Sequence, residues 1–346
     1  MMQPATLPHR AASLGTLGTL GSLVRVRRLA WLAVVTLGLT ILLDHVGCNS
    51  SAGPPTATDL RQPQRVISVG GAVTEIVVAL GAGEQLVAVD SSSGYPPAIV
   101  AALPKIGYQR SLTAEGILAL TPDLVVVSDE AGPPTTLVQL RKAGVRVVVV
   151  GGAITPAQTL ARIHMIGKAL VRPSDALVSR VDAEIVAAQT TIAAARNNAV
   201  PAVGASQGPS FVLIYARGAG TLMVSGTGTS GAAMLELAGG RNAITDFTGF
   251  KTLSAEALIA AAPDVIVVPS RGLASVGGNA GILAIPGVQQ TPAGQHQRII
   301  AFDDLLLLGF GPRLGPAMQA LSSLLGGTVA QPNAAVVAPA PAVLAR

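Results

Sequence analysis

The chain has 346 residues, half of them apolar and 12% charged, so it is long enough and apolar enough for two domains with buried cores. Its aromatic content of 3% leaves few rings for stacking on bases. Residues 1–47 hold four arginines against one aspartate, so most of the formal net charge of +5 lies there. No basic run follows them, which argues against nucleic-acid binding.

The start of the chain has the pattern of an export signal. A basic segment, Val24–Arg28, precedes an apolar run of 15 residues, Leu29–Leu43. This run is short for a membrane span and suits a signal peptide, with an uncleaved anchor helix as the alternative. Cys48, the single cysteine, stands where a lipoprotein signal places its lipidated residue, although His45 occupies a usually aliphatic position. We therefore expect a leader over 1–48, no disulfide within the chain, and a folded part outside the cytoplasmic membrane.

A first α/β lobe is predicted over 63–171, after a tether at 49–62 that is rich in Ser, Gly, Pro and Thr. Short β-branched runs alternate with helical ones, and a Gly70-Gly71 turn follows the first run, which favours a parallel sheet with helices on both faces. The expected strands are Arg65–Val69, Leu86–Val89, Leu124–Ser128 and Val145–Val150. The expected helices are Val73–Leu80, Leu112–Leu120, Thr135–Ala143 and Thr155–Leu170.

One long helix is predicted within a linking segment at 172–198. The pattern from about Ala176 to Arg196 lacks an interior Gly or Pro, and about 21 helical residues span roughly 30 Å, which suits a rigid strut between two lobes. A second lobe over 199–327 repeats the plan, and the Ala/Pro/Val-rich end at 328–346 is expected to be disordered. Its expected strands are Phe211–Tyr215, Val265–Val268 and Arg298–Ala301, and its expected helices are Gly231–Ala238, Ala255–Ala261 and Arg313–Leu325.

One stretch of the sequence occurs twice. Residues 111–128 and 252–270 share a small hydroxyl residue, Ala, Glu, an apolar helical run, Pro-Asp and a β-branched strand. Glu115 and Glu256 occupy matching places, so each lobe carries one acidic residue and the pair predicts symmetric docking on a basic partner. The alternative is a local role, because acidic residues favour the first turn of a helix.

A glycine-rich loop opens a helix in the second lobe. Residues 225–231 read SGTGTSG, and backbone N–H groups at a helix start, together with the hydroxyls of Ser225, Thr227 and Thr229, are able to hold carboxylates. The same loop spells GxGxxG from Gly226 to Gly231, with Asp246 downstream, so a nucleotide-dependent enzyme is an alternative. That alternative requires a strand ending at the acidic residue, and 240–246 provides only a weak one.

The remaining candidates indicate a binding protein rather than an enzyme. No Ser-His-Asp, Cys-His or HExxH arrangement occurs in the sequence. His164 and His296 are weak ligand candidates, since one lies within a helical pattern and the other in a loop. Tyr215 ends an apolar strand. Its side chain is expected either to contact a ligand or to pack in the core. Tyr108 lies in a loop, and the residues alone favour an ordinary exposed loop tyrosine over a ligand.

At this point the sequence resembles a known family. The segments RVISVGGAVTEIVVALGAG (65–83), LELAGGRNAI (235–244) and SAEALIAAAPDVIVV (254–268) resemble the helix-linked class of periplasmic binding proteins, which serve ABC importers of siderophores, vitamin B12 and haem. The resemblance covers about 63–327. Four further segments are similar to the haem-binding branch of the class: VDSSSGYPP (89–97), LPKIGYQRSLTAEGIL (103–118), DEAGPP (129–134) and LLLLGFGPR (305–313).

The resemblance implies an α/β fold of two Rossmann-like lobes, joined by a single long helix and binding haem in the cleft between them. It implies that Tyr108 is the axial ligand of the haem iron, with Arg110 two residues on supporting the phenolate. It also implies that Glu115 and Glu256 dock on the arginines of an ABC permease dimer with its ATPase. The ligand contacts expected in the cleft are Gly70, Gly71, Tyr108, Arg110, Tyr215, Ser225, Thr227, Thr229 and Phe310.

The resemblance also sets the expected biology and its alternatives. The protein is expected to be a monomer in the periplasm or at the outer face of the cytoplasmic membrane, attached to the membrane only through its leader or a lipid. A carrier of cobalamin or of a ferric siderophore is the nearest alternative. A siderophore carrier usually has several cationic or aromatic residues in its cleft, and this sequence has few of them.

Overall fold

The structure is a computed structural model that describes residues 61–198, 208–218 and 220–327. The predicted leader with Cys48, most of the predicted tether and the predicted tail at 328–346 lie outside the described residues. Within the described ranges, no helix combines the length and the apolar character that crossing a membrane requires.

The first sheet has four parallel strands in the order β2-β1-β3-β4. Successive side chains along a strand point to opposite faces, so the sheet has a core on each side. Val66 joins the larger core with α2 and α6, whereas Ile67 joins a second core beneath α4 and α5. The strands are β1 (Val66–Val69), β2 (Leu86–Val89), β3 (Leu124–Ser128) and β4 (Arg146–Val150).

The second sheet repeats this order and then departs from it. The parallel strands run β7-β5-β9-β10, the same arrangement as β2-β1-β3-β4, but β7 pairs only with the start of β5. The end of β5 pairs antiparallel with β6, which pairs with β8, so the second sheet adds to its predicted parallel strands an antiparallel ribbon that was not predicted. The two-residue β7 leaves the rest of that edge of β5 open, and the β6–β8 ribbon covers it. The strands are β5 (Ser210–Ala216), β6 (Leu222–Ser225), β7 (Arg241–Asn242), β8 (Phe250–Thr252), β9 (Val265–Pro269) and β10 (Ile299–Phe302).

The duplicated stretch has the same structural role in both lobes. In each copy the aspartate of the Pro-Asp pair accepts hydrogen bonds from the backbone at the start of the lobe's first strand. Asp123 Oδ1 accepts from Arg65 N at 3.1 Å, and Asp264 Oδ2 accepts from Ser210 N at 2.8 Å. These bonds fix the register at which β3 lies beside β1 and β9 beside β5. The repeated Pro-Asp is thus a strand clamp.

The predicted helices are confirmed within a few residues, including the short α4, which was predicted too long as Leu112–Leu120. The helices α3, α10, α11, α12 and α13 were missed, because four to six residues carry little readable periodicity. The helices of the first lobe and the linker are α2 (Gly71–Ala79), α3 (Pro97–Val100), α4 (Ala114–Leu118), α5 (Pro134–Lys142), α6 (Pro156–Leu170) and α7 (Asp175–Asn198), with the 3₁₀ turn η1 (Gly83–Gln85). Those of the second are α8 (Ser230–Leu237), α9 (Ala255–Ala261), α10 (Ser270–Ser275), α11 (Gly278–Leu283), α12 (Pro292–Gln295), α13 (Asp304–Leu308) and α14 (Leu314–Leu325), with η2 (Val288–Gln290).

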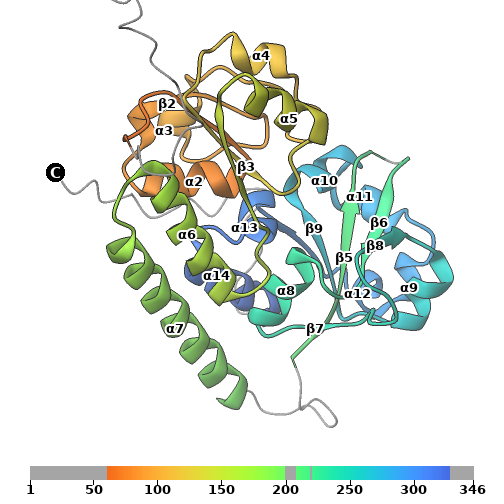
Figure 1. The fold of residues 1–346 in the computed structure, drawn as a ribbon. Coiled ribbons are helices and arrows are strands. Elements are labelled where there is room, and N and C mark those ends of the chain that lie inside the picture. Colours follow the sequence, from red (N-terminus) through yellow and green to blue (C-terminus); the bar gives the residue numbers. More distant parts are fainter. Residues whose placement is uncertain (1–60, 199–207, 219, 328–346) are drawn as a thin grey trace, which may run out of the picture. The chain divides into compact units, whose positions relative to one another are not determined.

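The linking helix α7 is packed along its length. It lies beside α6 and α14 (Figure 1). Gly315 of α14 allows close approach, because a Cβ there would lie 2.5 Å from the carbonyl oxygen of Glu184 in α7. The buried side of α7 is a stripe of apolar residues that joins a larger core. This core also contains Val66 of β1 and Phe211 of β5, so both sheets share one apolar cluster. The stripe consists of Leu177, Val181, Ile185, Ala188 and Ile192.

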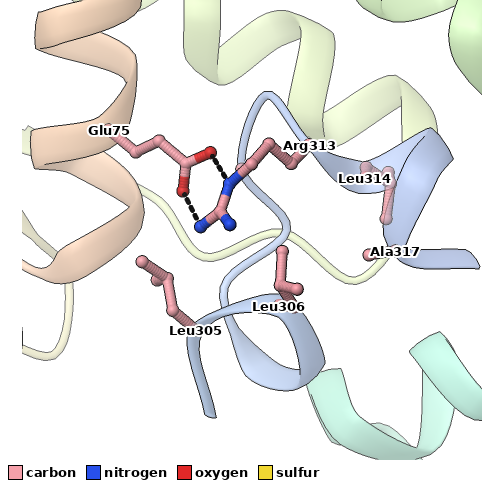
Figure 2. Close-up of a pocket in the computed structure, with 7 residues that line it drawn as sticks. Glu75, Leu305, Leu306, Arg313, Leu314 and Ala317 are labelled. Carbon is pink, nitrogen blue, oxygen red and sulfur yellow. Dashed lines mark hydrogen bonds and ion pairs between the residues drawn. The ribbon is translucent and has the colours of Figure 1, made fainter. Parts of the chain in front are cut away.

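A buried ion pair connects α2 to the start of α14 (Figure 2). Arg313 Nε donates to Glu75 Oε1 at 2.6 Å and Nη2 donates to Oε2 at 3.0 Å, so both carboxylate oxygens are engaged. The Arg313 guanidinium also lies 3.6 Å from the centroid of the Tyr95 ring. The Glu75 side chain is only 5% exposed, and burial raises the pKa of this carboxyl while Arg313 opposes the shift. The pair therefore ties the helix after β1 to the last helix of the second lobe.

Arg313→Ala is expected to destabilise the protein by about 3–5 kcal/mol, because it leaves the buried Glu75 carboxylate without a counter-charge. Urea unfolding followed by circular dichroism measures the loss. The control is Arg180→Ala, which removes a helix-surface ion pair with Glu184 at 2.8 Å and is expected to cost about 0.5 kcal/mol. Equal losses in the two variants would contradict the role assigned to the buried pair.

The stability of Arg313→Ala is also expected to depend on pH in a definite direction. Without Arg313, burial and the charge of Asp303 remain, and both raise the folded-state pKa of Glu75 further above its ordinary 4.5. The folded state then holds a proton that the unfolded state releases, so stability falls as pH rises above about 4.5. The deficit of Arg313→Ala relative to wild type should thus be smaller at about pH 5 than at about pH 7.5.

Candidate ligand-binding site

A cavity of about 990 Å³ lies at the carboxyl ends of the parallel strands of both sheets. This is where α/β folds place ligands, and the volume is at the upper end of the roughly 300–1,000 Å³ usual for ligand pockets. The lining includes residues that follow β1, β2, β3, β4, β5, β9 and β10, namely Gly70, Gly71, Ser91, Ser92, Asp129, Glu130, Gly152, Arg217, Arg271, Asp304 and Leu305. Gly70 and Gly71 lie where the sequence predicts, in the turn after β1.

Tyr108 lines the cavity, and its hydroxyl is held by a residue of the other lobe. Arg217 Nη2 donates to Tyr108 Oη at 3.0 Å, and Arg217 Nε donates to Tyr215 Oη at 2.9 Å. One guanidinium thus bridges two phenol oxygens, and it lies 5.3 and 5.4 Å from the centroids of the two rings. The hydrogen bond to Tyr108 is the main cause that raises the pKa of Arg217, so this cation stays charged beside the phenols.

The arginine expected to support Tyr108 has another partner. Arg110 lines the cavity, but its Nη2 pairs with Glu130 Oε1 at 2.8 Å, and this bond is the main cause that raises the pKa of Arg110. Gln109 Nε2 donates to the other oxygen of Glu130 at 3.1 Å. Glu130 thereby holds both residues that follow Tyr108. The partner of the Tyr108 phenol is Arg217. The sequence pattern that could have indicated it is Tyr215-Ala216-Arg217, because residues two apart at the end of a strand point to the same side.

The ribbon β6–β8 supplies an apolar wall that the sequence reading missed. The Tyr215 and Phe250 rings lie 5.7 Å apart with a 56° angle between their planes, a tilted arrangement that aromatic pairs favour. Met223 of β6 lines the cavity beside them. Phe250 is 37% exposed, unusual for a large apolar side chain. Further apolar lining comes from Ala72, Val73, Ala153, Ile154, Leu305 and Leu308.

The glycine-rich loop contributes less than predicted. Thr229 lines the cavity, but its hydroxyl caps α8 by accepting from Ala232 N and lies 2.6 Å from Ser225 Oγ. Ser225 is fully buried and Thr227 donates to the Phe247 carbonyl, and neither lines the cavity. The expected ligand contacts at Ser225 and Thr227 are therefore not formed here, because the protein itself uses both hydroxyls.

The loop also lacks the setting of a dinucleotide site. The strand before it, β6, is antiparallel to its neighbour, whereas that motif needs a parallel strand–turn–helix unit. Asp246 is exposed and ends no strand. The glycines have packing reasons instead: a Cβ on Gly226 would collide with Phe247, and one on Gly231 would collide with Leu213.

Phe310 is not where the sequence reading placed it. Its side chain is fully buried in the shared core and does not line the cavity. The backbone at Phe310 has a φ of 49°, in the left-handed region, and the cavity is reached by the neighbouring Leu308 and Gly309 instead. The contact predicted between Phe310 and a ligand is thus wrong for this structure.

Neither histidine of the described residues reaches the cavity. His164 Nδ1 lies 2.8 Å from Ser174 Oγ, and His296 Nδ1 lies 3.0 Å from the Pro292 carbonyl oxygen. The described part of the chain also contains no group of three or more His, Cys, Asp or Glu side chains suited to a metal ion. Tyr108 and Tyr215 are the described tyrosines that line the cavity.

A buried arginine at the cavity wall links loops of both lobes. Arg162 is 9% exposed, and its Nε donates to Gly151 O at 3.0 Å while Nη1 donates to Gly309 O at 2.9 Å. Burial lowers the pKa of Arg162, with Asp129 opposing the shift. No pattern in the sequence predicts that Arg162 is buried at the cavity, because an arginine inside a helical pattern is usually solvent-exposed.

Glu115 and Glu256 lie away from the cavity, exposed in the first turns of α4 and α9. Neither carboxylate has a hydrogen bond or ion pair among the described residues. Ser254 caps α9 by accepting from Ala257 N, whereas Thr113 makes no such bond at α4. Their equal placement follows from the duplicated stretch, and both side chains are free to contact a partner.

Residues 66–305 match the family model described as periplasmic binding protein, and this match covers more than half of the chain. The chain therefore belongs to the periplasmic binding protein family. Among solved structures, it is similar to the periplasmic heme-binding protein RhuT from Roseiflexus sp. RS-1 in apo form, with 44% identity, a TM-score of 0.71, and coverage of 76% of this chain and 97% of that one. It is also similar to the periplasmic heme-binding protein BhuT in complex with two hemes, with 42% identity, a TM-score of 0.71, and coverage of 77% and 99%.

Two curated relatives add detail. An uncharacterized ABC transporter substrate-binding lipoprotein of Bacillus subtilis, YvrC, is 28% identical over 266 residues, which is 76% of this chain and 80% of that protein. The vitamin B12-binding protein of Pectobacterium carotovorum is 41% identical over 86 residues, only 25% of this chain and 31% of that protein. Similarity to the haem-binding structures thus extends through both lobes, whereas similarity to the vitamin B12-binding protein is local.

Gly231→Ala is expected to destabilise the protein by about 1–3 kcal/mol, because the added Cβ would collide with Leu213 in the core. Chemical unfolding measures this loss. Gly220→Ala is the control, since nothing lies within 4 Å of a Cβ there. If the loop instead served a nucleotide, NAD or ATP would raise the wild-type melting temperature and Gly231→Ala would abolish that protection.

Proposed function

We propose that this protein captures haem outside the cytoplasmic membrane and delivers it to an ABC importer. The observation that carries the proposal is the Tyr108 hydroxyl, which lies in the cavity on the Arg217 guanidinium at 3.0 Å. Similarity to two haem-binding structures at 44% and 42% identity over about three quarters of the chain supports it. The protein acts as a carrier and not as an enzyme.

The chemistry of Tyr108 suits ferric haem. A phenolate is a hard anionic oxygen ligand that stabilises ferric over ferrous iron, as in tyrosine-ligated haem proteins. A free phenol ionises near 10, so binding at neutral pH needs help in losing the proton. The iron supplies most of that help, and Arg217, already donating to the phenol oxygen, stabilises the negative charge that forms. Arg217 thus takes the role that the sequence reading assigned to Arg110.

The cavity wall fits the mixed character of the cargo. Haem has a flat apolar ring and two carboxylates at one edge. Phe250, Met223 and Leu308 supply apolar surface, and arginines from both lobes supply charge. Cobalamin is a second candidate, favoured by the local match to the vitamin B12-binding protein. The tyrosine–arginine pair in the cavity favours haem.

Delivery requires a docking surface outside the cavity. Glu115 and Glu256 are exposed at matching positions of the two lobes, and we assign them to contacts with basic residues of the two permease subunits. The carrier works as a monomer in the periplasm or at the outer face of the cytoplasmic membrane. Cys48 would carry a lipid anchor there, in keeping with the lipoprotein name of the Bacillus relative.

Tyr108→Phe is expected to remove the absorption bands of a ferric phenolate when purified protein is titrated with hemin, because the ligand oxygen is gone. Hemin affinity should fall at least roughly tenfold. The chain has three tyrosines, so two matched controls exist. Tyr95→Phe keeps the ring beneath Arg313 and should leave the spectrum unchanged, and Tyr215→Phe should keep the phenolate bands.

Two outcomes would reject the assignment. Unchanged phenolate bands in Tyr108→Phe would place the iron on another ligand. A wild-type protein that binds cyanocobalamin in the same titration, but no hemin, would replace haem by cobalamin as the cargo.

Glu115→Lys combined with Glu256→Lys is expected to abolish haem uptake by cells while leaving hemin binding by the purified protein unchanged. Reversed charges would repel basic permease residues, and the sites lie outside the cavity. Growth on hemin as sole iron source measures uptake. The matched control is Glu84→Lys, an exposed glutamate in η1 of the first lobe. Normal uptake by the double variant would exclude docking through this pair.

A further inference from the structure

Four arginines line the cavity, and three of them are already committed to partners within the protein. Arg110 pairs with Glu130, Arg162 donates to two backbone carbonyls, and Arg217 donates to two phenol oxygens. The fourth is Arg271, the second residue of α10, directly after β9. Among the described residues, its guanidinium makes no hydrogen bond and no ion pair.

The position of Arg271 is fixed although its guanidinium is not engaged. The backbone N of Arg271 donates to Asp304 Oδ1 at 3.1 Å, which anchors the start of α10 to the start of α13. The side chain extends from there to the first lobe, since a Cβ on Gly94 would lie 3.6 Å from Arg271 Nη2. Gly94 belongs to the loop after β2 that also presents Ser91 and Ser92 to the cavity. A cation anchored on one lobe thus stands at the cavity edge against a loop of the other.

The positive charge of Arg271 is partly compensated by the nearby carboxyl group of Asp304. Asp304 lines the cavity, and burial raises the pKa of its carboxyl, while the hydrogen bond from the Arg271 backbone and the charge of Arg271 oppose the shift. A compensated cation exerts little long-range pull on anions in general. It gains most from an acceptor brought within hydrogen-bond distance, because charge-assisted pairs of guanidinium and carboxylate are directional and two-pronged. Such a residue distinguishes ligands by whether they carry a carboxylate at that place.

We propose that Arg271 binds a carboxylate of the cargo at the edge of the cavity and so selects a carboxylate-bearing iron porphyrin over one without carboxylates. This inference rests on the proposed function, and in haem the carboxylates are the two propionates. The contact joins a residue of the second lobe to a ligand whose iron is held by Tyr108 of the first. Arg271 is thus a specificity residue, whereas Tyr108 and Arg217 hold the metal.

The test compares hemin with hemin dimethyl ester, in which both carboxylates are esterified while the iron and ring remain. Both ligands are titrated in the same dilute detergent into wild type and Arg271→Gln, followed at the phenolate bands. Wild type is expected to bind hemin at least roughly tenfold more tightly than the diester. Arg271→Gln should lose that preference by weakening hemin binding alone, with the phenolate bands kept. Arg271→Lys, which keeps a charge without the two-pronged geometry, should retain part of it.

Two control variants make the result specific. Arg241→Gln removes an exposed arginine of the same lobe outside the cavity and should change neither affinity. Arg110→Gln tests the other lobe. If Arg110→Gln abolishes the preference and Arg271→Gln does not, the carboxylate lies at Arg110 and the inference is overturned. Failure of the wild type to bind hemin at all would instead overturn the proposed function, whereas tight hemin binding with no preference over the diester would overturn only the inference.

Discussion

The structure depends on one constraint, which is that the two sheets share a single apolar core. Val66 of β1 and Phe211 of β5 belong to the same cluster, and the buried face of α7 with α14 completes it. Separating the sheets would expose this surface to water and so lose hydrophobic burial, the dominant favourable contribution to folding. The Glu75–Arg313 pair adds a directional link between α2 and α14, because both carboxylate oxygens are engaged. The carboxyl ends of both sheets are therefore held where one ligand touches loops from each.

The two lobes share a strand arrangement but bring different side chains to the cavity. The strand order β2-β1-β3-β4 recurs as β7-β5-β9-β10, and Asp123 and Asp264 clamp equivalent strand starts. The second lobe alone carries the β6–β8 ribbon, which exists because β7 is too short to cover the edge of β5. That insertion brings Phe250 to the cavity. One lobe thus supplies the phenol, and the other supplies the guanidinium beside it and much of the apolar wall.

The sequence predicted most of the parallel strands well because β-branched runs bounded by Pro-Asp or glycine are local signals, and the strand Leu124–Ser128 was predicted to the residue. The short strands β7 and β8 carry no such signal and were missed. It predicted Tyr108 in the cavity through the family resemblance. It misassigned the phenol's partner, because the two-residue rule that favoured Arg110 holds along a strand, whereas Tyr108 and Arg110 lie in a turn held by Glu130. Arg217 is 109 residues from Tyr108, and a pairing at that distance is set by sheet order. Phe310 was misplaced because an apolar ring beside glycines suits a core as well as a cavity.

The charges around the cavity explain how a weakly basic chain could hold an anionic cargo without attracting anions in general. Glu130 neutralises Arg110, and backbone carbonyls occupy Arg162. Arg217 donates to two phenol oxygens, and in the proposed haem complex it would gain a full counter-charge when Tyr108 binds the iron as a phenolate. Favourable electrostatic energy is therefore released mainly when a ligand brings both a metal and an acceptor to their places. A small anion offers neither the metal nor the ring, so the arrangement proposed to bind haem gives phosphate or chloride little to bind.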